Sequence, residues 1–247
     1  MKAYRADLHI HSILSPCADL DMSPDRIVQF AIERGLDMIA VTDHNSTRQC
    51  AMVKKHAEGT NLLVINGCEV NSREEVHVLC LFEDDYSRDQ FQHFLDNCLP
   101  EIPNRPDHDG HQLVVDHQNN ITEEFPNHLT NPLTADLETI EKEVHRLNGI
   151  LIPAHVDRPI ASIYSQLGFL PTELKIDGLQ ISKHVAESEV RDHFDIPKEV
   201  TLIKASDAHY TEDIGSGVTS FYLYEKTFQE LKWALNQKNG RQVIIET

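Results

Sequence analysis

The chain has 247 residues and a formal net charge of −18, from 40 acidic and 22 basic side chains. This length suits one large α/β domain or two small ones, and a content of 40% hydrophobic and 25% charged residues is typical of a globular protein. A strongly acidic surface repels nucleic-acid backbones and anionic membranes, so nucleic acid is disfavoured except as a substrate. Small anionic substrates stay open where bound cations dominate the local potential.

The five cysteines are odd in number and widely spaced, without a CxxC pair, so the sequence predicts neither a disulfide framework nor a zinc ribbon. The N-terminal MKAYRADLHIHS has no long apolar region of the kind found in signal peptides. No run approaches the roughly 18 apolar residues of a membrane helix. We therefore expect a cytoplasmic protein without membrane contact. Fifteen histidines are well above ordinary usage and need an explanation.

The first part of the chain alternates strand and helix patterns. A strand over 3–10 leads to Ser23-Pro24-Asp25, which is typical of an N-cap, an N1 proline and an acidic first turn. Gly35 stands where a C′ glycine closes such a helix. The next expected elements are a strand at 37–44, a helix at 46–56, strands at 61–70 and 76–82, and a helix near 87–97.

Residues 100–135 differ from this pattern, because they are rich in proline and contain a predicted β-hairpin at 111–125 that turns at Asn119-Asn120. We interpret them as an insertion or flap within a single domain that spans 1–247. The elements expected after it are a helix at 135–147, a strand at 149–155, strands near 178–182, 200–205 and 218–224, helices near 187–193 and 227–237, and a last strand at 242–246. This alternation favours a parallel α/β barrel, with an open doubly wound sheet as the alternative.

Residue types that bind metals recur at the ends of the predicted strands. Taken alone, each has an ordinary structural interpretation: His77 inside an apolar run is typical of a core histidine, and Asp207 of a turn cap. Their repetition at five strand ends favours a metal site, since barrel active sites are built from strand ends on one face. The residues are Asp7, His9, His11, Asp43, His44, Glu69, His77, His155, Asp207 and His209.

The spacing of these residues indicates how ions would be held. His9 and His11 lie two apart, so on a strand both point to the same face and can chelate one ion. Glu69 can bridge two cations through its two oxygens, while His77 and His155 supply neutral imidazoles to a second ion. This mixed nitrogen and oxygen set suits Zn, Mn or Fe rather than Ca.

The order of these motifs resembles that of the PHP superfamily, named for polymerase and histidinol phosphatase. DLHIHS is followed by TDHN, a Gly-x-Glu, an isolated His, an AH at a strand end, and SDAH with Ile214-Gly215 behind it. The resemblance covers nearly the whole chain, about residues 4–225. It implies a distorted (β/α)7 barrel, TIM-barrel-like, with a trinuclear metal site that hydrolyses phosphoesters.

The resemblance also implies a ligand set. His9, His11, Glu69 and Asp207 would hold the first metal; Glu69 would bridge to a second held by His77 and His155; and His44, His209 and one residue of the following loop would hold a third. The sequence departs from the family pattern in that loop, at 15–21. Asp19 is our choice there, with Asp21 and Cys17 as alternatives.

The chemistry of such a site needs no Ser or Cys nucleophile. Closely spaced cations lower the pKa of a shared water and neutralise charge on phosphate oxygens, so a metal-bound hydroxide can attack phosphorus. We expect Glu69, Asp207 and His209 to be the catalytic residues. His209 or His44, where not engaged by metal, is placed to protonate the leaving oxygen.

Two cations near strand ends are expected to bind substrate. Arg158, in AHVDRP, suits a phosphate in fork geometry, with a surface ion pair as an equal alternative. Lys183 is a weaker phosphate ligand on the same argument. The remaining histidines are expected at the surface, although His108, His111 and His117 could line a flap over the cleft.

The function expected from these residues is that of a stand-alone, multinuclear metal-dependent phosphoesterase acting on a small phosphorylated metabolite or nucleotide with two to three divalent ions (Zn, Mn or Fe). One alternative is an exonuclease or phosphodiesterase that acts on nucleic-acid ends. Another is a non-catalytic PHP module, which the near-complete ligand set disfavours. C–N hydrolysis on an amidohydrolase-like barrel is disfavoured because no matching strand-end lysine is evident. We expect the 100–135 insert to shape specificity.

Overall fold

A computed structural model describes residues 1–245 of the chain. The strands are β1 (Lys2–Ile10), β2 (Met38–Val41), β3 (Leu63–Asn71), β4 (His77–Phe82), β5 (Leu113–Val115), β6 (Ile121–Glu124), β7 (Ile150–Pro153), β8 (Leu179–Ile181), β9 (Leu202–Lys204), β10 (Thr219–Leu223) and β11 (Gln242–Ile245). The helices are α1 (Pro24–Glu33), α2 (Cys50–His56), α3 (Asp85–Cys98), α4 (Pro106–Asp109), α5 (Leu137–Arg146), α6 (Ile163–Leu167), α7 (Glu187–Phe194) and α8 (Phe228–Leu235), with one 3-10 turn, η1 (Thr211–Asp213).

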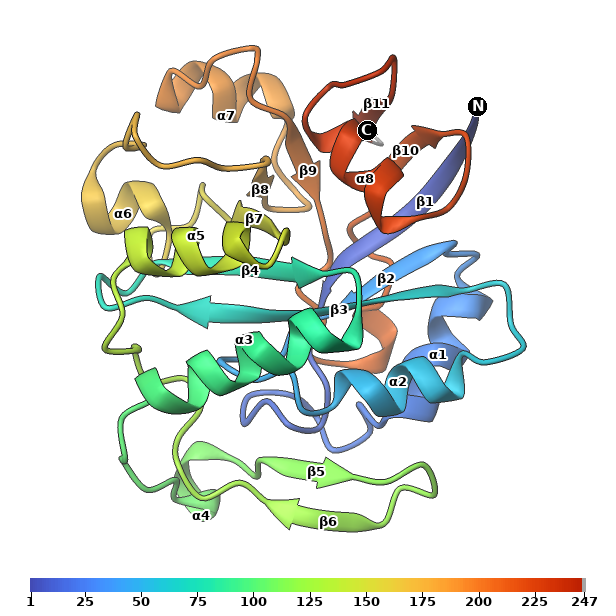
Figure 1. The fold of residues 1–247 in the computed structure, drawn as a ribbon, viewed down its shortest axis with the longest axis vertical. Coiled ribbons are helices and arrows are strands. Elements are labelled where there is room, and N and C mark those ends of the chain that lie inside the picture. Colours follow the sequence, from blue (N-terminus) through green and yellow to red (C-terminus); the bar gives the residue numbers. More distant parts are fainter. Residues whose placement is uncertain (246–247) are drawn as a thin grey trace.

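Seven strands form one curled, mixed sheet in the order β11-β10-β1-β2-β3-β4-β7, with helices packed around it (Figure 1). β1, β2 and β3 are parallel, but β4 returns antiparallel to β3 and then pairs antiparallel with β7. The expected alternation of parallel strands therefore fails at β4. The physical reason is a five-residue link between β3 and β4, which is long enough for a hairpin but too short for the crossover that parallel strands require.

Two of the four other strands, β8 and β9, form a short parallel pair that continues the curl of the sheet. The backbone amide of Val156, just after β7, donates to the carbonyl of Gln180 in β8 at 2.9 Å. On the other side, Ala208 forms a parallel bridge with Ile10 of β1. The seven strands β1, β2, β3, β4, β7, β8 and β9 thus follow one another around a distorted α/β barrel, as expected from the sequence.

Three apolar clusters hold this arrangement. The first fills the space between the strands and α8, and contains Leu8, Met38, Ile65 and Phe221. The second packs α3, α5 and α7 onto β4 and β7, and the third packs α1 and α2 onto β2 and the end of β1. Side chains of several strands meet in the first cluster and fill the interior of the barrel. The polar residues that come after these side chains along the strands therefore lie at one end of a packed interior.

Most element boundaries agree with the sequence analysis, and the deviations have local causes. α1 begins after the N-cap Ser23 with Pro24 in its first turn, and Gly35 follows with a φ of 66°. α2 begins at Cys50 rather than residue 46, because the amide and hydroxyl of Thr47 donate to Gln92 and hold the preceding turn outside the helix. The expected last strand, 242–246, is present to Ile245, and Glu246 lies outside the described residues.

The segment 100–135 contains the expected hairpin, β5 and β6, which lies beyond α2 and α3 at one end of the molecule (Figure 1). It braces two loops at the end of the barrel: Leu113 N donates to the carbonyl of Ile13, and the side chain of Gln49 bonds both backbone groups of Val115. Within residues 1–245, no helix combines the length and the apolar character needed to cross a membrane.

Candidate metal centre

His9 and His11 point into the barrel because the end of β1 is irregular. The pairing of β1 with β2 shifts register between Asp7 and Ile10. Leu8 still belongs to the interior cluster, whereas Ile10 packs on the side of α1 and α2. A bulge re-aims side chains in this way. Both imidazoles are consequently buried on the same face, with their Nε2 atoms 3.1 Å apart, as their spacing predicts.

The carboxylate of Glu69, which is 1% exposed, lies at the centre of the histidines. Its Oε1 atom is 3.0 Å from His77 Nδ1 and 3.1 Å from His155 Nε2. His77 reaches this end of the barrel because β4 runs antiparallel, so its first residue lies beside the last residues of the parallel strands. The other three imidazole nitrogens lie 3.2 to 3.4 Å from one or other oxygen of Glu69: His9 Nε2, His11 Nε2 and His44 Nδ1.

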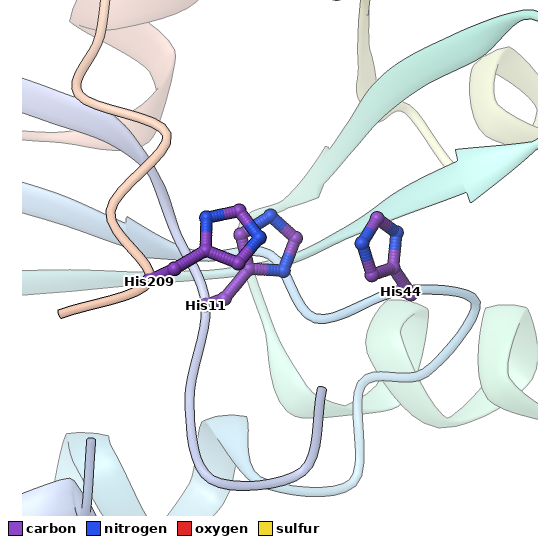
Figure 2. A group of neighbouring side chains, drawn as sticks. All are labelled: His11, His44 and His209. Atoms are coloured by element: carbon purple, nitrogen blue, oxygen red, sulfur yellow. The ribbon is translucent and has the colours of Figure 1, made fainter. Parts of the chain in front are cut away.

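Asp207 and His209 complete the cluster from the loop after β9. Asp207 Oδ1 lies 3.2 Å from the Nε2 atoms of both His9 and His11. The ring of His209 stacks on that of His11 with centroids 4.3 Å apart. Figure 2 shows His11, His44 and His209 gathered from three separate loops, and the centroid of the His44 ring is 4.5 Å from that of His11.

The donor set fits divalent transition ions. Neutral imidazole and carboxylate ligands bind Zn²⁺ at about 2.0–2.2 Å, so two ligands of one ion lie about 3 to 3.5 Å apart. The distances around Glu69 fall in this range. In addition, the buried Nδ1 of His44, which lies 3.2 Å from Glu69 Oε2, has no hydrogen-bond partner within residues 1–245. Three groups of donors converge closely enough to share an ion: His9, His11, Glu69 and Asp207; His44, Glu69 and His77; and His11, His44 and His209.

The electrostatics of the cluster keep its acids ionised. Burial alone would raise the pKa of Glu69, but charge on His77 and His9 outweighs it and holds the pKa well below its ordinary value. The pKa of Asp207 is lowered for the same reason, because His9 and His11 outweigh its burial. Burial and the charge on His11 lower the pKa of His209 to about 4. At neutral pH His209 is therefore uncharged, which suits a metal ligand better than a proton donor.

A second layer of polar residues orients the histidines. Gln180 of β8 is 1% exposed, and its Oε1 lies 2.8 Å from His9 Nδ1. Asp43 accepts a 2.7 Å hydrogen bond from Ser15 Oγ, which in turn lies 2.9 Å from His11 Nδ1. Both partners leave Nε2 of the histidine facing the cluster, as is usual for histidines that bind metals. The sequence analysis did not assign these roles to Gln180 or Ser15.

Two residues of the cluster have strained backbone. His155 has a φ of 30° and Asp207 a φ of 53°, in the left-handed region that non-glycine residues seldom adopt. The strain at Asp207 is held by its neighbour Ser206, whose amide donates to the buried Asp7 at 3.0 Å. Such strain persists only where surrounding contacts over-determine it, and it is concentrated at functional sites.

A cavity of about 320 Å³ opens beside the cluster. One wall is formed by His44, Glu69, His77, His155, Asp207 and His209, and the other by residues 158–161. Arg158 Nη1 lies 2.7 Å from Asp207 Oδ2, while the side chain stays 45% exposed. The ion pair expected as one alternative for Arg158 is therefore present, and the residue lines the cavity, whereas phosphate binding by Arg158 stays a prediction.

The structure does not bring Lys183 or Asp19 into the cluster. Lys183 Nζ donates to Ser216 Oγ at 2.8 Å, and Lys183 does not line this cavity. The backbone amide of Asp19 donates to the carbonyl of His209 at 2.8 Å, but its carboxylate is exposed and accepts from the amide of Asp21. Their proposed roles stay predictions.

Cys17 lies nearer to the cluster, within electrostatic reach of His11 and Glu69, although the residue is exposed to solvent. Desolvation raises the pKa of the Cys17 thiol to about 11. The charge on His11 opposes this rise, and the charge on Glu69 adds to it. Its thiol is therefore protonated at neutral pH. The histidines of the insert lie elsewhere: His108 pairs with Asp109 and His111 with Glu124, and no residue of 100–135 lines the cavity.

Fold and cluster together define an α/β barrel with a buried group of residues, at one end, that is able to hold metal ions. The chain belongs to the PHP domain family, whose sequence model matches residues 7–153. This confirms the family expected from the order of the motifs. No curated protein sequence matches the chain.

Solved structures share the fold at low sequence identity. The lesion-specific endonuclease EndoQ from Pyrococcus furiosus is 20% identical with a TM-score of 0.73; the match covers 98% of this chain and 58% of the endonuclease. A proposed metal-dependent phosphoesterase from Bifidobacterium adolescentis is 15% identical with a TM-score of 0.56, over 83% of this chain and 87% of that one. An amidohydrolase from Chromobacterium violaceum with bound sulfate is 18% identical with a TM-score of 0.53, over 85% and 89%.

Proposed function

We propose that the chain is a metal-dependent phosphoesterase that hydrolyses small phosphate esters. The observation that carries the proposal is the single buried carboxylate of Glu69 with five imidazole nitrogens within 3.4 Å of it, next to a cavity with a guanidinium on its wall. Membership of the PHP domain family and the likeness to a phosphoesterase fold support it.

The proposed ligands follow the three groups of converging donors. His9, His11, Glu69 and Asp207 would hold one ion, and Glu69 with His44 and His77 a second, with His155 beside Glu69. A third position falls among His11, His44 and His209. Divalent ions held there would supply Lewis-acid catalysis and lower the pKa of water. Zn, Mn and Fe are the ions that suit these ligands.

The chain's own residues have distinct tasks in this proposal. Gln180 and Ser15 fix the rings of His9 and His11, so their Nε2 atoms face inward without reorganisation. Asp207 is held between these histidines and Arg158, with one carboxylate oxygen toward each side. Arg158 lines the cavity, where its guanidinium would donate to phosphate oxygens in fork geometry.

A second candidate function is cleavage of a nucleic-acid backbone, favoured by the likeness to EndoQ over 98% of the chain. A structure of Endonuclease Q with a 27-mer duplex carrying an abasic lesion is also similar, with a TM-score of 0.67. The net charge of −18 opposes this candidate, since proteins that follow a phosphate backbone concentrate Lys and Arg along it.

The test is a panel of phosphoesters incubated with purified protein and added Mn²⁺: nucleoside mono- and bisphosphates, sugar phosphates, histidinol phosphate, single-stranded oligonucleotides and a duplex with an abasic site. Elemental analysis should find about two to three transition ions per chain, as expected for a multinuclear site. Release of phosphate from small esters supports the proposal. Cleavage confined to the oligonucleotides replaces it with the second candidate. A metal-free protein of native fold that cleaves nothing in the presence of Mn²⁺ overturns both.

A further inference from the structure

The insert 100–135 lies against the two loops, after β1 and after β2, that carry proposed metal ligands, although none of its residues lines the cavity. In the loop after β1, the carbonyl of Ile13 accepts from the amide of Leu113 at 3.2 Å. Gly110 packs so closely on the carbonyl of Pro16 that no Cβ would fit there. An effect of the insert on the cluster would therefore pass through the backbone of these loops. Its expected effect on specificity stays a prediction.

The contact with the loop after β2 is made by Asn45, whose side chain is buried and fully hydrogen-bonded. Its Nδ2 donates to the carbonyl oxygens of Leu129 and Asn131 in the insert, at 2.7 and 2.8 Å. Its Oδ1 accepts from the amide of Asn71 at 2.9 Å. Two acceptors at one end of the side-chain amide and a donor at the other fix its orientation, and the residue is only 1% exposed.

Asn45 also lies between two proposed metal ligands. It follows His44 directly in the chain, and its backbone amide donates to the carbonyl of Glu69 at 2.9 Å, beside the β-bridge between His44 and Glu69. Its φ of 45° lies in the left-handed region, where a residue other than glycine persists only if surrounding contacts hold it. The bonds from its side chain to the insert are such contacts. The insert therefore helps to hold the backbone from which the ring of His44 projects.

His44 depends on this backbone more than the neighbouring histidines do. It belongs to two of the three donor groups, and Figure 2 shows its ring directed toward the other members of one of them. The rings of His9 and His11 are each oriented by a hydrogen bond to a polar side chain. Within residues 1–245, no such bond orients the ring of His44, and its buried Nδ1 lies 3.2 Å from Glu69 without a hydrogen bond.

We propose that Asn45 is a positioning residue through which the insert holds His44 in place for metal binding. The inference rests on the proposed function, because it takes the cluster to be a metal centre. Asn45 would contact no ion and would act through the backbone of its neighbour. Loosening its bonds to the insert should weaken the ions that use His44 and spare the donor group of His9 and Asp207, which lacks His44.

The experiment measures metal affinity rather than turnover. Metal-free wild type and variants are titrated with Co²⁺, whose visible absorption reports on its ligands. Asn45→Gly removes the three side-chain bonds, and glycine adopts a positive φ without strain. Gln112→Ala loosens the insert from the other side of the contact, because the buried Oε1 of Gln112 accepts from the amide of Leu129 at 2.7 Å. The double variant Asn45→Gly with Gln112→Ala completes the cycle.

Asn119→Gly is the matched control. Asn119 also has a positive φ, of 60°, and its Nδ2 also joins the insert to the barrel, through a 2.9 Å bond to Asp25. It lies at the exposed turn of the hairpin rather than beside a proposed ligand. Its replacement by glycine should leave Co²⁺ binding as in the wild type.

Asn45→Gly and Gln112→Ala should each weaken the Co²⁺ ions that use His44 by about 10- to 100-fold, the range for residues that orient a ligand, and keep the ion of the remaining donor group. The double variant should bind Co²⁺ no more weakly than Asn45→Gly, because both changes act through the same bonds. Urea unfolding of each metal-free variant accompanies the titration. A loss of stability with unchanged Co²⁺ affinity would make Asn45 a merely structural residue.

The remaining outcomes separate this inference from the proposed function. An equal loss at every ion position, or losses that add in the double variant, would overturn the role of Asn45 and leave the phosphoesterase intact. A wild type that binds no Co²⁺ would overturn both. The expected losses of Co²⁺ affinity in a protein that hydrolyses no ester would support the role of Asn45 and overturn the proposed function alone.

Discussion

Glu69→Gln is the substitution that separates the proposed metal centre from an ordinary polar core. Glutamine keeps the size of the side chain but removes its charge and replaces one oxygen with an NH₂ group. Glu69 belongs to two of the three donor groups, so one substitution would remove a ligand from two of the proposed ion positions at once. The pKa of Glu69 is held well below its ordinary value, chiefly by histidine charge that outweighs burial, so the wild-type side chain is ionised at every working pH.

The expected loss of metal affinity and turnover follows from the membership of Glu69 in two donor groups. Disturbing even an outer partner of a metal ligand reduces affinity about 10- to 100-fold, so losing a shared ligand should weaken each of two ions by at least this factor. Turnover should fall by about 10²- to 10³-fold, as for the removal of a preorganised electrostatic group. The assay is metal content after gel filtration, together with the rate on the best ester of the panel.

The matched control is Glu141→Gln. Glu141 is also a buried glutamate (6% exposed) that pairs with a histidine, His145, at 2.6 Å, but it lies on α5 outside the barrel. It should keep its metals and its activity. A Glu69→Gln protein that retains wild-type metal content and turnover would refute the bridging role of this residue.

Two further substitutions test residues around the site, and a third tests the ion pair of α5 outside the barrel. Gln180→Leu removes the acceptor for His9 Nδ1 and should weaken metal binding about 10- to 100-fold, as measured by chelator competition. Arg158→Ala should raise KM about 10- to 100-fold with metal content retained, and Arg158→Lys should recover only part of the loss because an ammonium cannot bind in fork geometry. His145→Gln should lower the free energy of unfolding by about 1 kcal/mol at pH 6 and by less as the pH rises, measured by urea titration.

The sign for His145 follows from its partners. Its hydrogen bond to Asp177 raises the pKa of His145 against an opposing effect of burial, and Glu141 adds to the rise. The stabilisation is therefore complete below the unfolded value of about 6.5 and is lost as the pH rises through the folded pKa. A difference between wild type and variant that grows with pH would contradict this. Unchanged metal affinity in Gln180→Leu, or unchanged KM in Arg158→Ala, would remove the roles given to those residues.

The fold and the ligand cluster could be predicted from the sequence to different extents. The alternation of apolar runs with helix signals was enough to predict a barrel and nearly every strand, because the hydrophobic period is a local property. The direction of β4 was not predicted, since it depends on the short link before His77 and on which strand β7 pairs with. His77 was nevertheless expected among the ligands on the order of motifs alone, and the hairpin explains how it reaches them.

Residues that orient a proposed metal ligand, without being ligands themselves, could not be recognised from the sequence. Gln180 sits in a short apolar strand like any buried glutamine, and only the fold places its oxygen 2.8 Å from His9. The loop after His11 shows the opposite limit. Asp19 has the right chemistry for a metal ligand, but the hydrogen bond from its backbone amide to His209 leaves its carboxylate in solvent. Loop conformation of this kind is set by tertiary contacts and not by residue type.

The closure of the barrel between β1 and β9 rests on little backbone pairing. It consists of the bridge between Ile10 and Ala208, with hydrogen bonds of 2.9 and 3.3 Å to the neighbouring backbone. The proposed ligands of the first ion come from both edges of this seam, His9 and His11 on one and Asp207 on the other. An ion bound there would act as a cross-link, and its binding free energy would add to the stability of the closed form. Metal binding and closure of the barrel between β1 and β9 would then be thermodynamically linked. A mutation of a ligand would weaken the closure, and a mutation at the seam would weaken metal binding.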